Sequence, residues 1–366
     1  MERYYYGAGN AMGYSYSGSE LLKADSPMMS TTAGTYQAIY GRKVWSQLNQ
    51  EFNAFSILPK KPWDRSGWRV ITGKPNGGAL HGGVAENSTL PETVRPTFQH
   101  VAAKPKTIAH TFDMSETAIF LADRDDGMGD IRSVLKEEMG KHHAEMVNKM
   151  LLTDVSTAAA NNFESLDRIT TGNTNMVSGT HYDAGDEDIY SIDRSTNPWS
   201  FAEDNADGSS ANRTLSLDHL DTLFQQIWER GGNPKVILTG YDTLMRLQQL
   251  LQSQQRFMEE KRVTPTYNGV KGVPGIEAGF IVATYNGVPI IPTKDMPDDG
   301  AISRMYFLDT DYMHFSTAIP TQYFESGIET GDPFAINRLG QEGLYRTMGE
   351  VWTTFFGAQG SVRDLK

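Results

Sequence analysis

Residues 84–118, which read VAENSTLPETVRPTFQHVAAKPKTIAHTFDMSETA, decide how the rest of the chain is interpreted. Residues 97–113 within this stretch read as an extended segment, and residues 63–72 before it carry the aromatic and β-branched bulk of a strand. A glycine-rich tip at residues 77–83 joins the two into a long excursion. Because an isolated two-stranded ribbon is marginal in water, we expect this excursion to rest on another copy of the chain.

Helices are expected on both sides of the excursion. Apolar side chains recur at three- and four-residue steps through residues 34–53, and Pro59 and Pro62 break the pattern. The clearest helix covers residues 129–152 and is long enough to be the backbone of a flat domain. Its apolar stripe consists of Ile131, Leu135, Met139, His142, Met146 and Met150.

Residues 155–213 are polar, with ten acidic and three basic side chains, and are interpreted as a surface insertion. An α/β lobe begins at Leu215 with a helix whose apolar residues share one face. The run KVILT at 235–239 predicts a buried strand, and residues 242–251 a helix capped by Asp242. Asn286-Gly287 predicts a type I′ hairpin, and strands are expected at 305–308 and in the tail at 343–356.

The order of these pieces resembles the Hong Kong 97 type capsid fold of tailed viruses. Residues 84–118 are similar to the family's extended loop, and KHHAEMVNKMLLTD at 141–154 is similar to its spine helix. PKVILTGYDTLMRLQQL at 234–250 and GFIVATYNGVPIIPTKDMP at 279–297 resemble the strand, helix and hairpin of its axial domain. YFLDTDYMHFSTA at 306–318 resembles the strand that follows. No single motif is specific, but the ordered series is.

The resemblance implies an α+β chain in six parts. Residues 1–57 would be an N-terminal arm, 58–112 the extended loop, and 113–154 the peripheral domain with its spine helix. Residues 155–213 would be the acidic insertion, 214–320 the axial domain, and 321–366 the return strands of the peripheral domain.

The resemblance also implies a function. The chain would be a major capsid protein, assembling as pentamers and hexamers into an icosahedral shell around double-stranded DNA. It would be made in the host cytoplasm and end in the virion. Its partners would be copies of itself, a separate scaffolding protein, a portal and, as an open option, a decoration protein. An encapsulin-like compartment is the alternative with the same fold.

Composition limits the remaining options. A net charge of −12 repels phosphate, so tight binding of packaged DNA is not expected. The absence of cysteine excludes disulfides and thiolate chemistry. The sequence has no signal peptide and no apolar run of membrane-spanning length, so we expect a soluble chain.

Interface anchors are the main candidate site residues. Aromatic side chains dominate interface hot spots, which favours the tyrosines of the glycine-rich arm and two tryptophans of the extended loop. An alternative for Trp68 is packing against the base of its own loop. The resemblance also raises a cross-link between Lys74 and Asn337 with Glu342 nearby, but we do not predict it, because the reaction needs a buried carboxylate base beside both partners. The candidate contacts are Tyr4, Tyr5, Tyr6, Tyr14, Tyr16, Trp63, Trp68 and Lys74.

Catalytic, cofactor and metal sites are not predicted. The run from Asp123 fails as a calcium loop because Val134 stands where a glutamate is needed. His142 and His143 lack the spacing of a zinc helix, and nucleophile-elbow and phosphate-loop motifs are absent. A metal-dependent enzyme or carbohydrate-binding module using the acidic insertion remains a less favoured alternative. A divalent ion could bind Asp183, Asp186, Glu187 and Asp188, although a solvated loop is the simpler interpretation.

Overall fold

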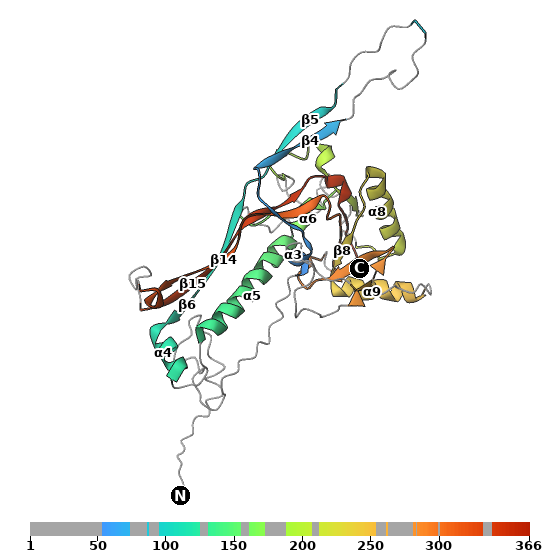
Figure 1. Cartoon of the computed structure of the whole chain (residues 1–366). Coiled ribbons are helices and arrows are strands. Elements are labelled where there is room, and N and C mark those ends of the chain that lie inside the picture. Colours follow the sequence, from blue (N-terminus) through green and yellow to red (C-terminus); the bar gives the residue numbers. More distant parts are fainter. Residues whose placement is uncertain are drawn as a thin grey trace. The chain divides into compact units, whose positions relative to one another are not determined.

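A computed structural model describes most of the chain from Asn53 onward (Figure 1). The described residues are 53–73, 86–87, 95–124, 131–154, 161–172, 188–206, 212–253, 261–262, 281–282, 284–298, 301–331 and 339–366. They combine helices and strands, which confirms the predicted α+β class. The helix expected at 34–53 lies outside them except for Asn53, where the short helix α3 (Asn53–Ile57) begins.

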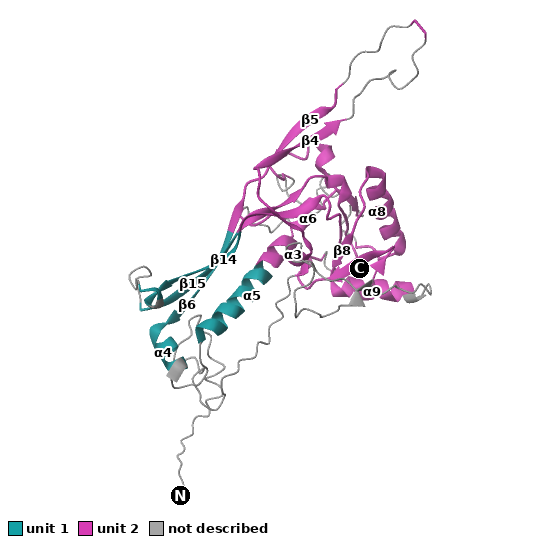
Figure 2. Cartoon of the chain, in the orientation of Figure 1, with its two compact units in different colours: residues 1–50, 108–146, 320–347 teal, residues 51–107, 147–319, 348–366 magenta. Residues whose placement is uncertain are grey.

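The chain divides into two compact units (Figure 2). Unit 1 takes its described residues from 108–146 and 320–347. Unit 2 takes them from 51–107, 147–319 and 348–366. Four elements run from one unit into the other: α5 (Ile131–Leu152), β6 (Lys106–Ser115), β14 (Met313–Gly327) and β15 (Gly340–Thr353).

A six-stranded sheet organises unit 2. Its order is β11-β12-β8-β13-β16-β7, with parallel and antiparallel pairs. The predicted strands at 235–239 and 305–308 and the predicted hairpin are all confirmed. Asn286 and Gly287 have φ of 51° and 81°, as a type I′ turn requires. The strands are β11 (Thr284–Tyr285), β12 (Val288–Pro292), β8 (Val236–Thr239), β13 (Met305–Leu308), β16 (Gly360–Val362) and β7 (Glu203–Asn205).

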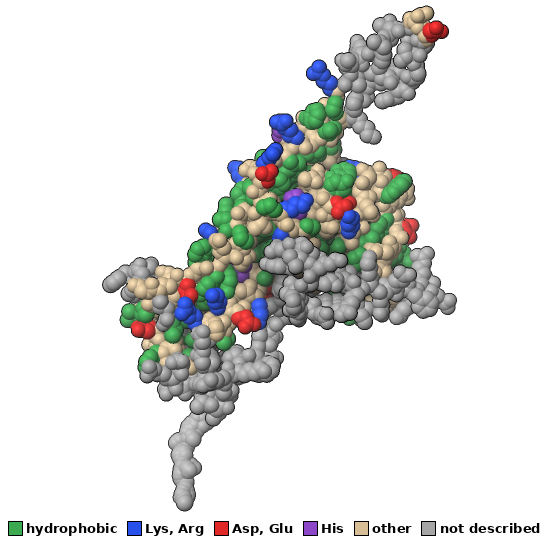
Figure 3. Space-filling view, viewed as in Figure 1, with side chains coloured by type: hydrophobic (Ala, Val, Ile, Leu, Met, Phe, Trp, Pro, Cys, Tyr) green, Lys and Arg blue, Asp and Glu red, His purple; other side chains and the backbone are tan. Residues whose placement is uncertain are grey.

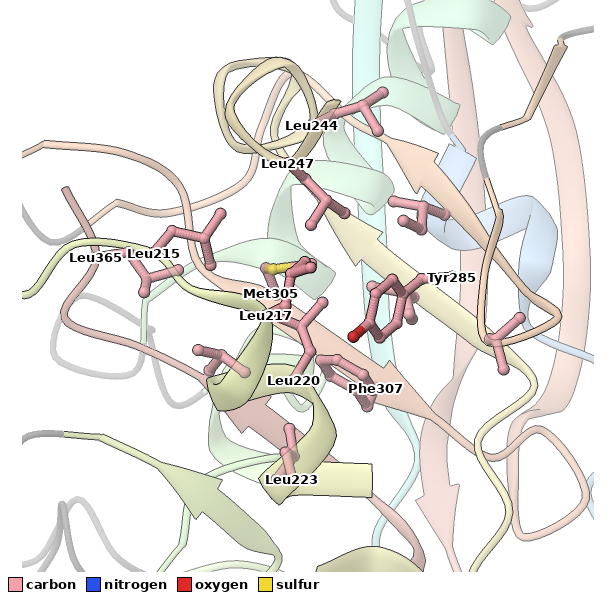
Figure 4. Close-up of a cluster of buried hydrophobic side chains, with 14 of the residues drawn as sticks. Leu215, Leu217, Leu220, Leu223, Leu244, Leu247, Tyr285, Met305, Phe307 and Leu365 are labelled. Atoms are coloured by element: carbon pink, nitrogen blue, oxygen red, sulfur yellow. The ribbon is translucent and has the colours of Figure 1, made fainter. Parts of the chain in front are cut away.

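Two helices share the apolar core of this sheet (Figure 4). Leucines of α8 (Leu217–Arg230) and of α9 (Tyr241–Ser253) converge with strand residues such as Met305 and Phe307. Each fully buried leucine of this kind stabilises the fold by roughly 1.5–3 kcal/mol. Helix α9 begins at Tyr241, so Asp242 lies within its first turn instead of capping it, and its carboxylate accepts the Ser303 N–H at 2.8 Å.

Parts of the expected surface insertion are buried. Asp167, in the short helix α6 (Leu166–Ile169), has no exposed surface, and its Oδ1 accepts the Tyr306 hydroxyl at 2.7 Å. Arg304 and Arg363 hold the same oxygen at 3.0 and 2.8 Å. The expectation of a surface position is therefore wrong for Asp167. Its charge is neutralised by two arginines more than a hundred positions away, and the charge balance of residues 155–213 alone does not reveal them.

The single extended segment expected at residues 97–113 is divided into two strands, β5 (Thr97–Ala102) and β6. β4 (Gly67–Gly73) pairs with β5 in an antiparallel ribbon, but β6 starts anew at Lys106 and joins another sheet. Pro105, which has no N–H to donate, separates β5 from β6. The ribbon therefore ends at Ala102, and the expectation that it runs to residue 113 is wrong. The second sheet has the order β3-β14-β15-β6, with β3 at Lys60–Pro62.

Unit 1 contains α4 (Glu116–Arg124) and most of the spine helix α5. Its part of α5 lies against β6, β14 and β15: the Tyr345 hydroxyl donates to the Lys136 carbonyl at 2.8 Å, and Arg132 pairs with Glu325. The helix is confirmed, but its buried histidine is His143, whereas His142 is half-exposed. The buried face follows steps of four from Ile131, which reach residue 143 and not 142.

The remaining elements are short. They are η5 (Pro198–Ser200), η6 (Ile328–Thr330), η7 (Phe356–Ala358), and the pair β9 (Lys261–Arg262) with β10 (Ile281–Val282). The strand-like tail predicted at 343–356 is confirmed as most of β15. Within the described residues, none of the helices is long and apolar enough to span a membrane.

Candidate assembly surface

The β4–β5 ribbon has two different faces. Side chains alternate along each strand, so Trp68 opposite Val101 faces one side and Ile71 opposite Phe98 faces the other. Ile71 and Phe98 are 61% and 59% exposed, and because they lie opposite each other they form one contiguous apolar patch. Arg69 opposite His100 extends the same side. We call Arg69, Ile71, Phe98 and His100 the outer ribbon face.

Basic and apolar side chains meet on this ribbon. On the view in Figure 3, Lys and Arg side chains and hydrophobic ones lie close together on this part of the molecule, and within the two strands the basic side chain is Arg69. The whole chain carries a net charge of −12. An apolar patch that carries an arginine, on a molecule with a net negative charge, is complementary to the acidic surface of another copy of that molecule.

The opposite ribbon face is anchored by tryptophans. The Trp68 ring lies 4.7 Å from Trp352 and 5.3 Å from Tyr190, and Trp63 lies 5.1 Å from Trp352, measured between ring centroids. Trp63 and Trp68 are both half-buried. Trp68 thus packs on the base of its own ribbon, as the alternative interpretation held, and a role for either tryptophan between subunits stays a prediction.

A buried ionic cluster lies where the ribbon returns to the body of unit 2. Lys106, the first residue of β6, places its Nζ 3.1 Å from Glu350 Oε2 and 3.9 Å from Glu164 Oε2. Glu350 Oε1 also accepts the backbone N–H groups of Glu164 and Val351. Burial raises the pKa of Glu350 to about 7, even though Lys106 acts in the opposite direction. The base of the ribbon therefore carries a carboxyl group that titrates near neutrality.

Most other predicted site residues lie outside the described part of the chain. This holds for the five tyrosines, Lys74, Asn337, Asp183, Asp186 and Glu187. Asp188 is described and exposed, and Glu342 is half-buried on β15. Within the described ranges, no group of three or more His, Asp or Glu side chains is placed to hold a metal ion.

The sequence reasoning missed the outer ribbon face. Ile71 and Phe98 are both visible as large apolar residues in predicted strands, but their exposure depends on register. Once Trp68 is placed against Val101, alternation puts Ile71 and Phe98 on the other side. The sequence therefore contains both residues of the patch, but their position on one exposed face follows only from the pairing of the two strands.

A long helix on a sheet, a two-stranded ribbon and an α/β unit define a shell protein of the Hong Kong 97 type. The chain belongs to the SU10 major capsid protein family, whose model matches residues 106–341. Its role is therefore that of a structural capsid subunit in a virion. None of the curated proteins matches its sequence.

Solved structures agree on the fold. The chain is similar to the capsid protein of cyanophage A-1(L), with 15% identity and a TM-score of 0.63, covering 88% of this chain and 95% of the other. It is similar to the capsid of a native GTA particle, with 13% identity, a TM-score of 0.56 and coverage of 91% and 96%. The SrpI encapsulin of Synechococcus elongatus PCC 7942 is similar at 11% identity, with a TM-score of 0.51 and coverage of 88% and 91%.

Proposed function

We propose that copies of this chain assemble as pentamers and hexamers into an icosahedral shell that encloses double-stranded DNA. The match to a major capsid protein family over residues 106–341 carries this proposal. The same family supports a structural role without catalysis. The net charge of −12 also supports this proposal, because a negatively charged shell does not bind the packaged DNA tightly.

The outer ribbon face supplies a physical reason for assembly. Ile71 and Phe98 lie directly opposite each other, so covering them removes one continuous apolar patch from water. Arg69 beside them favours an acidic neighbour. In this proposal each copy lays this face on an adjacent copy, and a lone molecule leaves the patch exposed.

Further partners extend the proposal. Copies of the chain would associate by themselves, a separate scaffolding protein would determine the size of the shell, a portal would occupy one vertex, and a decoration protein could bind the finished shell. These partners are supported by the resemblance to tailed-virus capsids alone. An encapsulin-like compartment shares the fold at 11% identity, but the family match favours the virion shell.

The test is assembly of the purified full-length chain, measured by sedimentation velocity and electron microscopy. The wild-type chain should form large closed particles. Ile71→Asp or Phe98→Asp should shift the material towards small species, because a charge would be buried at each contact. Thr214→Asp, at an exposed position away from the ribbon, is the matched control. A wild-type chain that stays monomeric when concentrated would refute the proposal.

A further inference from the structure

A shallow pocket opens beside α8. Its volume is about 300 Å³, and its walls come from α8, from the segment before β8 and from the β11–β12 hairpin. Trp228 forms part of this wall and is 76% exposed, more than the other large hydrophobic residues of the described chain. Gln225, which also lines the pocket, donates to Glu229 at 2.8 Å, so an acidic group stands beside it. We call Phe224, Gln225, Trp228, Asn233, Pro234 and Asn286 the α8 pocket.

A second apolar surface lies on α9. Tyr241 is 65% exposed and Met245 48% exposed, and their spacing of four places them side by side on the helix. Arg246, the next residue, is also exposed. We call Tyr241, Met245 and Arg246 the α9 patch. The buried side of the same helix, with Leu244 and Leu247, faces the core, so the patch points away from it.

The pocket and the patch lie at opposite ends of one strand. Asn233 and Pro234 come just before β8, and Tyr241 comes just after it. One copy of unit 2 therefore presents a hollow at one end of β8 and a ridge at the other. A closed ring of identical subunits needs two different, matching surfaces on each copy, because its contacts are head-to-tail.

We propose that the α9 patch of one copy docks into the α8 pocket of the next copy around a capsomer ring. The proposal rests on the proposed shell function and names the contact within it. In this contact the exposed Met245 side chain would enter the hollow lined by Phe224 and Trp228, so apolar surface of both copies would be removed from water. The charges also match, since Arg246 would approach Glu229 and the indole face of Trp228, both of which attract a guanidinium.

Disulfide trapping tests the contact directly. The natural chain has no cysteine, so Gln225→Cys with Met245→Cys introduces the sole possible disulfide partners. Assembled particles of the double variant, oxidised and then dissolved in denaturant, should give a ladder of linked chains on a non-reducing gel. Each single variant should give none. Particles without a ladder, or a disulfide closed within one chain, would overturn the contact.

Charge exchange gives an independent test. Glu229→Arg and Arg246→Glu should each raise the chain concentration needed for assembly about tenfold, since like charges would face each other. The double exchange should restore assembly, which a mere folding defect would not do. Thr214→Arg is the control for an added surface charge. If neither single variant assembles less well than this control, the contact is wrong.

The two proposals fail in different ways. A wild-type chain that forms no particle overturns the shell function and the contact together. Particles that form normally while the cysteine pair stays unlinked overturn the contact alone.

Discussion

Replacing Glu350 by glutamine should abolish a pH dependence of stability that the wild-type chain has between about pH 4.5 and 7. The Glu350 carboxyl is buried, and burial raises its pKa from 4.5 to about 7. A group whose pKa is higher in the folded chain stabilises folding fully below its unfolded pKa. That contribution is lost as the pH rises through the folded pKa. The charged carboxylate is therefore the less stable form, despite Lys106 at 3.1 Å.

The magnitude follows from the change in pKa. A rise from 4.5 to about 7 corresponds to about 3 kcal/mol between the two protonation states. In the Glu350→Gln variant the new side chain keeps a carbonyl oxygen for the two backbone donors that Glu350 now accepts, so its stability should resemble that of protonated Glu350. At pH 8 the variant should accordingly be more stable than the wild-type chain by up to about 3 kcal/mol.

Chemical denaturation of dissociated subunits at pH 5 and pH 8 measures this effect. The quantity of interest is the difference between wild type and Glu350→Gln at each pH, since other titrating groups then cancel. Glu86→Gln, at an exposed position, is the control and should change neither value. An equal pH dependence in wild type and Glu350→Gln would refute the reasoning.

Three other substitutions test separate features. Asp167→Asn should cost about 3–5 kcal/mol and reduce soluble yield, because the buried Arg304 and Arg363 lose the carboxylate that they share, although Arg304 keeps its ion pair with Asp154. Exposed Asp64→Asn should cost less than about 1 kcal/mol. For His143, burial and then neighbouring histidines lower the pKa to about 4, so its contribution to stability is present above pH 6.5 and is lost as the pH falls towards 4. The protection factors of the α5 amides, which correct for the intrinsic pH dependence of exchange, should fall over that interval, and fall less in His143→Gln. Gly287→Ala should lower the free energy of unfolding by about 1 kcal/mol through its φ of 81° alone, because an added Cβ meets no atom there; equal stability by denaturation would contradict this.

Features set by neighbours in the sequence were predictable. Asn286-Gly287 defined its turn, because two consecutive positive φ angles suit few residue pairs. The strand at 235–239 and the spine helix followed from apolar runs and periodicity. Such elements can be predicted from the local sequence, because the turn or the apolar face that the pattern specifies does not depend on a distant partner.

Features set by distant partners were not predictable. Asp167 read as one acid among many in a polar segment, and its burial depends on Arg304 and Arg363. The contact of the buried His143 with His110 on β6, 2.7 Å between Nδ1 atoms, joins residues that are distant in the sequence. The exposure of Ile71 and Phe98 followed from a strand register that composition does not reveal. In each case the sheet pairing or charge partner lies dozens of residues away.

The four elements that run through both units restrict how this chain can be divided. Unit 1 draws its described residues from two separate stretches, and β14 and β15 each pass from one unit to the other within a single strand. No gene truncation at one point would therefore release either unit as an intact fragment. Any change in length within these strands must be accepted by both units at once, so loop tips, and not strand interiors, are the places where foreign peptides could be displayed on this scaffold.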